Sequence, residues 1–150
     1  MNDLEDVIVR YVSRFILPFV QLYGLYVVLH GHLSPGGGFS GGAIIGTSMI
    51  LYALSFNLAA GSKKLSHDVS SILESTGALI FAGMGLLSIL LGANFLANRA
   101  AGIPLGTPGN LFSSGSIAII TFGVGIKVAS TMITLFYSLI EEEGHSHDHH

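Results

Sequence analysis

Four long apolar stretches, separated by polar or glycine-rich segments, set the pattern of this 150-residue chain. A helix needs roughly 20 mostly apolar residues to cross the hydrocarbon core of a bilayer, and each stretch has close to that length or more. The pattern therefore predicts an all-α membrane protein. Its four transmembrane helices are expected over about Tyr11–Leu29, Gly41–Ala60, Ile72–Leu96 and Gly115–Ile140.

The two ends of the chain are polar. The acidic N-terminal segment leads into the first apolar stretch without a small-residue cleavage site, so we expect this stretch to remain as a permanent span. Residues 1–144 are predicted to form one four-helix transmembrane domain. Residues 145–150 are rich in histidine, and we expect them to be a disordered tail without a role.

The composition supports a membrane location. Half of the residues are hydrophobic and only 10% are charged, whereas soluble domains average about 25% charged residues. No basic patch with interleaved aromatic residues suggests a nucleic-acid partner. The chain has no cysteine and no nucleotide-binding, hydrolase or zinc-helix motif. We therefore expect no enzymatic activity, no metal site and no cofactor in the chain itself.

The distribution of basic residues predicts the orientation in the membrane. Four spans put both termini on one side, together with Arg10, Arg14, Lys63 and Lys64, while the other side holds only Arg99. Because an excess of Lys and Arg marks the cytoplasmic side, both termini are predicted to be cytoplasmic.

Lys127 is the most informative single residue, because it lies near the middle of the fourth predicted span. A charged lysine at that depth costs at least about 2.5–3.5 kcal/mol on insertion scales, so it is expected to have a partner or to face water. Its neighbours at helical spacing form a polar or small stripe: Gly123, Thr131, Thr134 and Ser138. Two interpretations stay open, a candidate ion or proton pathway that includes Lys127, Thr131 and Thr134, or a structural pairing with a carboxylate of another subunit.

Glu74 also has two interpretations. It falls in the first turn of the third predicted span, and Ser71-Ile-Leu-Glu74 fits a capping box, in which Ser71 caps the helix and Glu74 answers three residues later. Alternatively, Glu74 is a carboxylate at the cytoplasmic mouth of a proton or sodium path.

His30 and His32 flank Gly31 at the end of the first predicted span. Histidine can relay protons near neutral pH, so both are candidates for a proton pathway. A structural role at the membrane interface is an equally good interpretation. Two histidines alone make a poor metal site.

The segment GHLSPGGGFSGG, at residues 31–42, joins the first two predicted spans. Pro35 lacks a backbone donor, and Gly36–Gly38 can adopt backbone angles that are closed to other residues. We expect a Pro/Gly-rich, non-helical hairpin near the outer face of the membrane, with Phe39 as an apolar anchor. The further glycines, Gly41 and Gly42, indicate close packing as well.

The string His30-Gly31-His32-Leu33-Ser34-Pro35-Gly36-Gly37-Gly38-Phe39, followed by Gly41-Gly42, resembles the B subunits of Mrp-type multisubunit sodium/proton antiporters. The resemblance extends to the chain length, the four spans and a loop with glycine and proline, residues 102–109, before the last span. Pro35 and Phe39 match motif positions regarded as functionally important in that family.

The resemblance implies a small, multi-pass subunit in the plasma membrane of a prokaryote. Its partners would be the lipid bilayer and the other membrane subunits of an antiporter module that moves Na⁺ and H⁺. The homologous subunit also occurs in archaeal membrane-bound hydrogenases, so hydrogenase subunits are alternative partners. A third interpretation is a purely structural subunit that seals the interface between larger ones.

Overall fold

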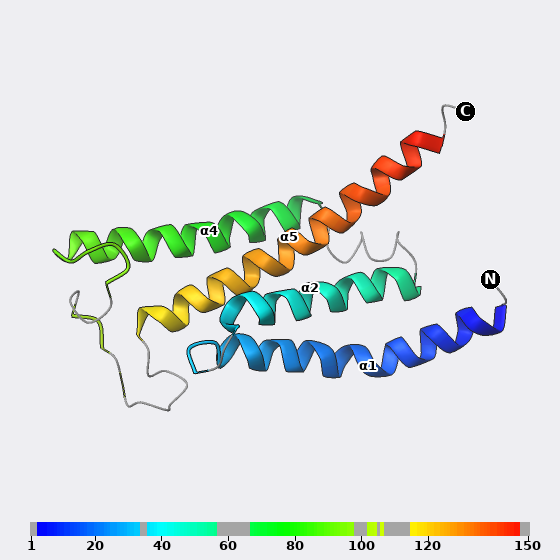
Figure 1. Cartoon of the computed structure of the whole chain (residues 1–150), viewed down its shortest axis with the longest axis horizontal. Coiled ribbons are helices and arrows are strands. Elements are labelled where there is room, and N and C mark those ends of the chain that lie inside the picture. The colour runs from blue at the N-terminus through cyan, green and yellow to red at the C-terminus, as the bar shows by residue number, and fades with distance from the viewer. Residues whose placement is uncertain are drawn as a thin grey trace.

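The computed structural model describes residues 3–33, 36–56, 67–97, 102–104, 106 and 115–147, and all regular structure among them is helical. The helices are α1 (Asp3–Leu29), α2 (Gly37–Phe56), α4 (His67–Leu90) and α5 (Ser116–His147). Each of the four contains a segment long and apolar enough to cross a membrane, which confirms the predicted fold class. The first turns of α1 and the last turns of α5 lie at the same end of the molecule (Figure 1).

The start of α2 differs from the expected hairpin. The helix begins at Gly37, four residues before the predicted span, so most of the glycine run is helical. Within the glycine run, the described residues with positive φ angles are Gly36 (100°) and Gly37 (55°), where the absence of a Cβ permits them. Ser34 and Pro35 lie outside the described residues, so a hairpin at that point stays a prediction.

The capping-box prediction for the third span is wrong. Helix α4 begins at His67 and has Asp68 in its first turn, so Ser71 and Glu74 lie inside the helix. The other end is closed by glycine: Gly92 has a φ of 77°, and the amide of Ala93 donates to the carbonyl of Ser88 over 3.0 Å. This pattern is typical of a Schellman C-cap.

Helix α5 is longer than the predicted fourth span. It continues to His147, so the first part of the predicted disordered tail is helical. Residues 148–150 lie outside the described residues.

The helices stand side by side in the order α1, α2, α5, α4 (Figure 1). On α5, the residues that meet α2 include Gly125 and Ala129, whereas Gly123 and Lys127 meet α4. At roughly 100° per residue, these two sets lie on opposite sides of α5. The result is an open row rather than a closed bundle, and at most a third of the most apolar part of any span is buried.

Small residues make the contacts between helices. The largest fully buried side chains among the described residues are serines, namely Ser48, Ser88, Ser116 and Ser130. Three glycines of α2 face α5, and Gly41, on the side toward α1, lies against Val28. Because lipid tails are as apolar as leucine, membrane helices associate through such close backbone packing rather than through a hydrophobic core.

Two alanine substitutions should separate packing from helix propensity. A methyl group on Gly42 would lie 2.5 Å from the carbonyl oxygen of Gly125, whereas one on Gly83 would meet nothing within 4 Å. We expect Gly42→Ala to lower the free energy of unfolding of the detergent-purified chain by about 1–3 kcal/mol, because α2 and α5 must separate. The control Gly83→Ala should raise it by up to ~1 kcal/mol, since alanine favours helix. Equal effects of the two substitutions would contradict backbone contact between α2 and α5.

Candidate functional site

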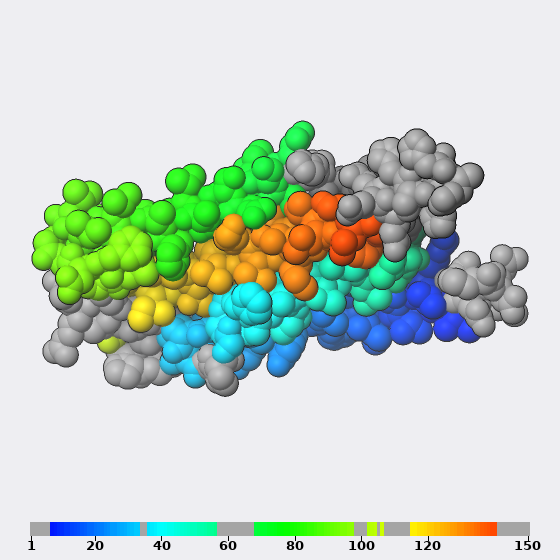
Figure 2. Space-filling model, turned by 45° about the horizontal axis from the view of Figure 1, so that its top comes forward, coloured from blue at the N-terminus to red at the C-terminus, as the bar shows by residue number. Residues whose placement is uncertain are grey.

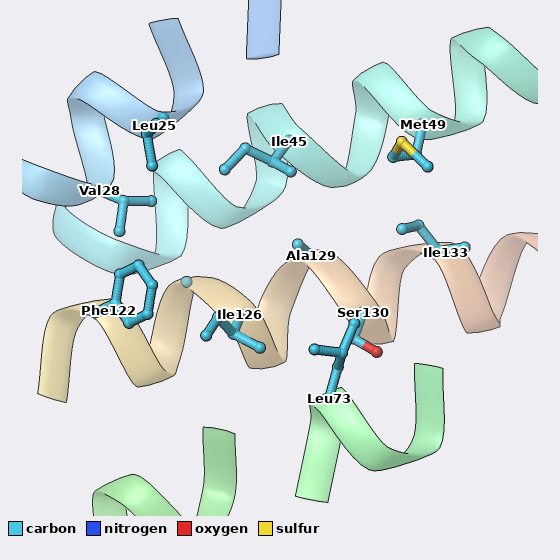
Figure 3. Close-up of a pocket in the computed structure, with 11 residues that line it drawn as sticks. Leu25, Val28, Ile45, Met49, Leu73, Phe122, Ile126, Ala129, Ser130 and Ile133 are labelled. Atoms are coloured by element: carbon cyan, nitrogen blue, oxygen red, sulfur yellow. The ribbon is translucent and has the colours of Figure 1, made fainter. Parts of the chain in front are cut away.

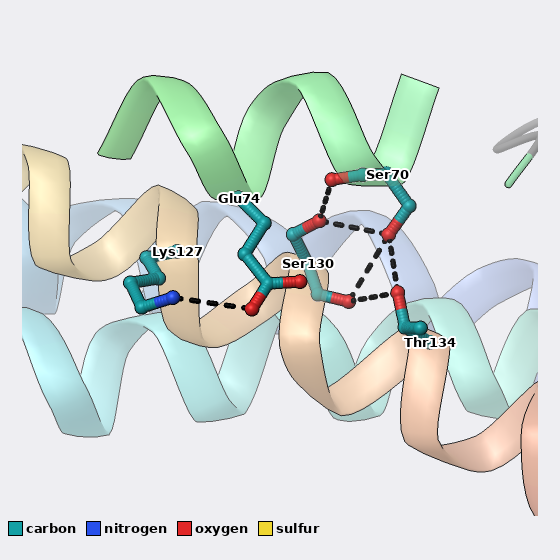
Figure 4. A network of polar contacts seen from close by, with 5 residues as sticks. All are labelled: Ser70, Glu74, Lys127, Ser130 and Thr134. Atoms are coloured by element: carbon teal, nitrogen blue, oxygen red, sulfur yellow. Dashed lines mark hydrogen bonds and ion pairs between the residues drawn. The ribbon is translucent and has the colours of Figure 1, made fainter. Parts of the chain in front are cut away.

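An ion pair joins α4 to α5. The Nζ atom of Lys127 donates to Oε1 of Glu74 over 3.1 Å (Figure 4). The two residues are 53 positions apart in the sequence, and the packing of α4 against α5 brings them together. The partner expected for Lys127 is therefore present in the same chain.

A cluster of hydroxyl groups lies beside the ion pair (Figure 4). Ser70 Oγ is 2.8 Å from Ser130 Oγ and 2.7 Å from Thr134 Oγ1. Ser130 Oγ donates to the carbonyl oxygen of Ser70, and Thr134 Oγ1 donates to that of Ser130. Each hydroxyl has an acceptor inside the protein, as groups at membrane depth require. The cluster and the ion pair together form a polar seam between α4 and α5.

Thr131 extends this polar region. Its hydroxyl is buried beside the carboxylate of Glu74, and no hydrogen bond of good geometry joins it to any described residue. Three of the predicted pathway residues, Lys127, Glu74 and Thr131, therefore lie together, and Thr134 belongs to the adjoining hydroxyl cluster.

The Glu74–Lys127 ion pair lies inside the membrane spans, where charged groups are costly. Lys127 is 11 residues from the start of the span Ser116–Ile140 and 13 from its end, which corresponds to roughly 17 and 20 Å along the helix, whereas Glu74 is six residues, or roughly 9 Å, from the start of the span Asp68–Leu90. Its side chain is 44% exposed and that of Glu74 is 35% exposed in the isolated chain. Hydrocarbon cannot solvate charges, so this face of the row has to meet protein or water in the membrane.

The two histidines predicted to belong to the pathway, His30 and His32, do not belong to the polar seam. His30 and His32 are in the turn after α1, at one end of the row. The ring of His30 stacks on Tyr26 at a centroid distance of 4.1 Å, and its Nδ1 is 3.0 Å from the carbonyl oxygen of the same tyrosine. These contacts fit a structural role in ending α1, and the pathway role stays a prediction.

The glycine-rich motif has a packing role in the described residues. Gly38, Gly41 and Gly42 are buried between helices. Phe39 points outward with 65% of its surface exposed, so its apolar ring is free to pack outside the chain.

Sequence reasoning missed two members of the seam, Ser70 and Ser130. A signal was present: Ser70 stands one turn before Glu74, and Ser130 stands one turn after Lys127. Serine is common in membrane helices, so this spacing becomes informative only when the two helices are known to be neighbours.

The chain has relatives among known membrane proteins. The sequence profile of a family described as a domain related to the MnhB subunit of Na⁺/H⁺ antiporters matches residues 8–134. The antiporter subunit mnhB2 of Staphylococcus aureus, strain MRSA252, is 30% identical over 135 residues, which cover 90% of this chain and 94% of the relative. The subunit of the same name from Staphylococcus haemolyticus is 29% identical over 135 residues, which again cover 90% of this chain and 94% of the relative.

A solved structure is also similar. It is that of the membrane-bound sulfane sulfur reductase, an archaeal respiratory membrane complex, one chain of which matches with a TM-score of 0.68 and 32% identity. The match covers 84% of this chain and 54% of that chain, so this chain spans about half the length of its structural relative.

Removing one partner of the ion pair should be worse than removing both. Lys127→Met or Glu74→Gln leaves an uncompensated charge at membrane depth, and each should lower the free energy of unfolding in mixed micelles by about 1–2 kcal/mol, less than for a fully buried pair. The double variant should recover most of that loss. Strictly additive effects of the two single substitutions would show that the residues do not interact.

Proposed function

Because the chain belongs to the family of the MnhB subunit of Na⁺/H⁺ antiporters, we propose that it is a non-catalytic membrane subunit of a multisubunit Na⁺/H⁺ antiporter module. In this proposal it supports both assembly of the complex and movement of ions. Its partners are the other membrane subunits of that module and the surrounding lipid. The transported ions, Na⁺ and H⁺, are substrates of the assembly and not cofactors of the chain.

The observation that carries an ion-coupling role is the Glu74–Lys127 pair at membrane depth. The carboxylate of Glu74 and the ammonium of Lys127 together carry no net charge, which lowers the free-energy cost of keeping them in the membrane. A proton or cation that binds Glu74 gives the pair a net positive charge. Ionisable residues inside membrane spans are expensive to keep and commonly mark ion or proton routes. The hydroxyls of Ser70, Ser130 and Thr134 provide an adjoining polar route toward the first turn of α4.

The second candidate is the equivalent subunit of a respiratory membrane complex. The similarity to a chain of the sulfane sulfur reductase favours it, and a membrane-bound hydrogenase is a further parent complex of this kind. The chain has no cysteine, so in either complex it would hold no thiolate-bound cluster. The redox chemistry would belong to other subunits.

The proposed location is the plasma membrane of a prokaryote with both termini in the cytoplasm. In the sequence, Arg10, Arg14, Lys63 and Lys64 belong to the segments that this proposal assigns to the cytoplasm, and Arg99 belongs to a segment that it assigns to the other side. This distribution satisfies the positive-inside rule.

Transport by the assembled complex tests the ion-coupling role. In everted vesicles, Lys127→Met and Glu74→Gln should each lower Na⁺-dependent proton movement by roughly tenfold or more, since positioned proton-transfer groups contribute about 10²–10⁴-fold. The matched control is Thr76→Val, because the Thr76 hydroxyl is bonded to the carbonyl of Ile72 in its own helix. Normal transport by both variants in fully assembled complexes would remove the pair from the pathway and leave a structural subunit.

The subunit composition of the native complex distinguishes an antiporter from a respiratory membrane complex. Mass spectrometry after mild detergent extraction should find antiporter subunits without a redox enzyme. A stoichiometric hydrogenase or sulfur reductase subunit would replace the antiporter proposal by the respiratory one.

A further inference from the structure

An apolar groove runs along α5 on a side turned away from Lys127, and Ser130 of the seam and Leu73 of α4 are also part of its lining. Its volume is about 270 Å³, and side chains from all four helices line it (Figure 3). On α5, Phe122, Ile126, Ala129 and Ile133 point to the groove, and Lys127 is roughly 130° further round the helix at about 100° per residue. All lining residues lie inside the membrane spans, so the groove opens at membrane depth. Figure 2 shows that the helices lie exposed side by side rather than wrapped around one another.

One polar residue, Gln21, adjoins this groove. On α1, Gln21, Leu25 and Val28 follow spacings of four and three and therefore share one face, and the latter two line the groove. The amide Nε2 of Gln21 also donates to the sulfur of Met49, a lining residue of α2, over 3.6 Å. Gln21 thus lies at the edge of the groove, in contact with one of its lining residues.

The amide of Gln21 has hydrogen-bonding capacity that the described residues of this chain leave unused. It offers two N–H donors and a carbonyl acceptor, and its contact with Met49 uses one donor on a thioether, which is a weak acceptor. The side chain is exposed and stands eight residues before the end of α1, roughly 12 Å inside the span. Acyl chains offer no hydrogen bond at that depth.

We propose that this groove seats a transmembrane helix of a partner subunit. That helix places an apolar side chain among Leu25, Ile45 and Ile126 and a hydrogen-bonding side chain, such as serine, threonine or asparagine, against the amide of Gln21. An acyl chain would fill the apolar pocket and leave the amide unsatisfied, whereas a helix satisfies both parts of the surface. The inference rests on the proposed function, because it requires an assembly of several membrane subunits.

Photo-crosslinking in the purified complex tests which molecule occupies the groove. A benzophenone amino acid replaces Met49, and the control carries it at Leu54, which is on the opposite side of α2 and 62% exposed. We expect the Met49 position to form an adduct with one transmembrane helix of a different subunit, identified by peptide sequencing, that the Leu54 position does not reach. An adduct with lipid, an adduct with a second copy of this chain, or no adduct from Met49 would each overturn the proposal.

Substitution of Gln21 tests the polar part of the surface. Gln21→Leu replaces the amide with an apolar side chain of similar size. It should reduce at least fivefold the amount of the crosslinked partner that co-purifies with the tagged chain. The control Thr47→Val removes an exposed hydroxyl that is already bonded to the carbonyl of Ala43 over 2.7 Å, and it should leave co-purification unchanged. Unchanged co-purification in Gln21→Leu would overturn the role of the amide.

The two proposals fail in distinguishable ways. If the wild-type chain retains no other membrane subunit, the proposed function is overturned. If the wild-type complex is intact but the Met49 position yields no adduct with a partner helix, only the groove proposal is overturned.

Discussion

Close approach of glycine backbones in α2 is the constraint on which the rest of the structure depends. Gly38, Gly42 and Gly46 face α5, while Gly41 lies against Val28 of α1. A side chain at any of the first three would push α2 away from α5. It would thereby also change how α5 is aligned relative to α1. Since membrane helices gain little from apolar contact alone, this backbone fit determines which helices become neighbours.

The second level of organisation is polar and joins α4 to α5. The Glu74–Lys127 pair and the hydroxyls of Ser70, Ser130 and Thr134 occupy one side of α5, and glycine contacts with α2 occupy the other. Helix α5 therefore holds the row together with two different kinds of interaction. The polar kind is also the one that can respond to a proton or a cation, so structure and proposed function meet at the same seam.

The sequence was sufficient to predict the fold class, because hydropathy over 20 residues measures the property that a bilayer selects. It also marked Lys127 and Glu74 as costly residues. It could not pair them, since nothing in one dimension shows that the third and fourth spans are neighbours. The helix starts were missed at Gly37 and His67 for a related reason: tertiary contacts stabilise glycine in a helix against its low propensity, and the polar first turn of α4 lacks the hydropathy of a span.

An open row of helices is a wall only one helix thick. A helix with its side chains is about 10–12 Å across, so neighbours seated on the two faces of α5 would be separated by a single layer. Ile126, on the groove face, is adjacent in sequence to Lys127, on the seam side. The groove and the ion pair therefore belong to the same turn of one helix, so the molecules that meet them in an assembled complex would be held at a fixed spacing by α5 alone.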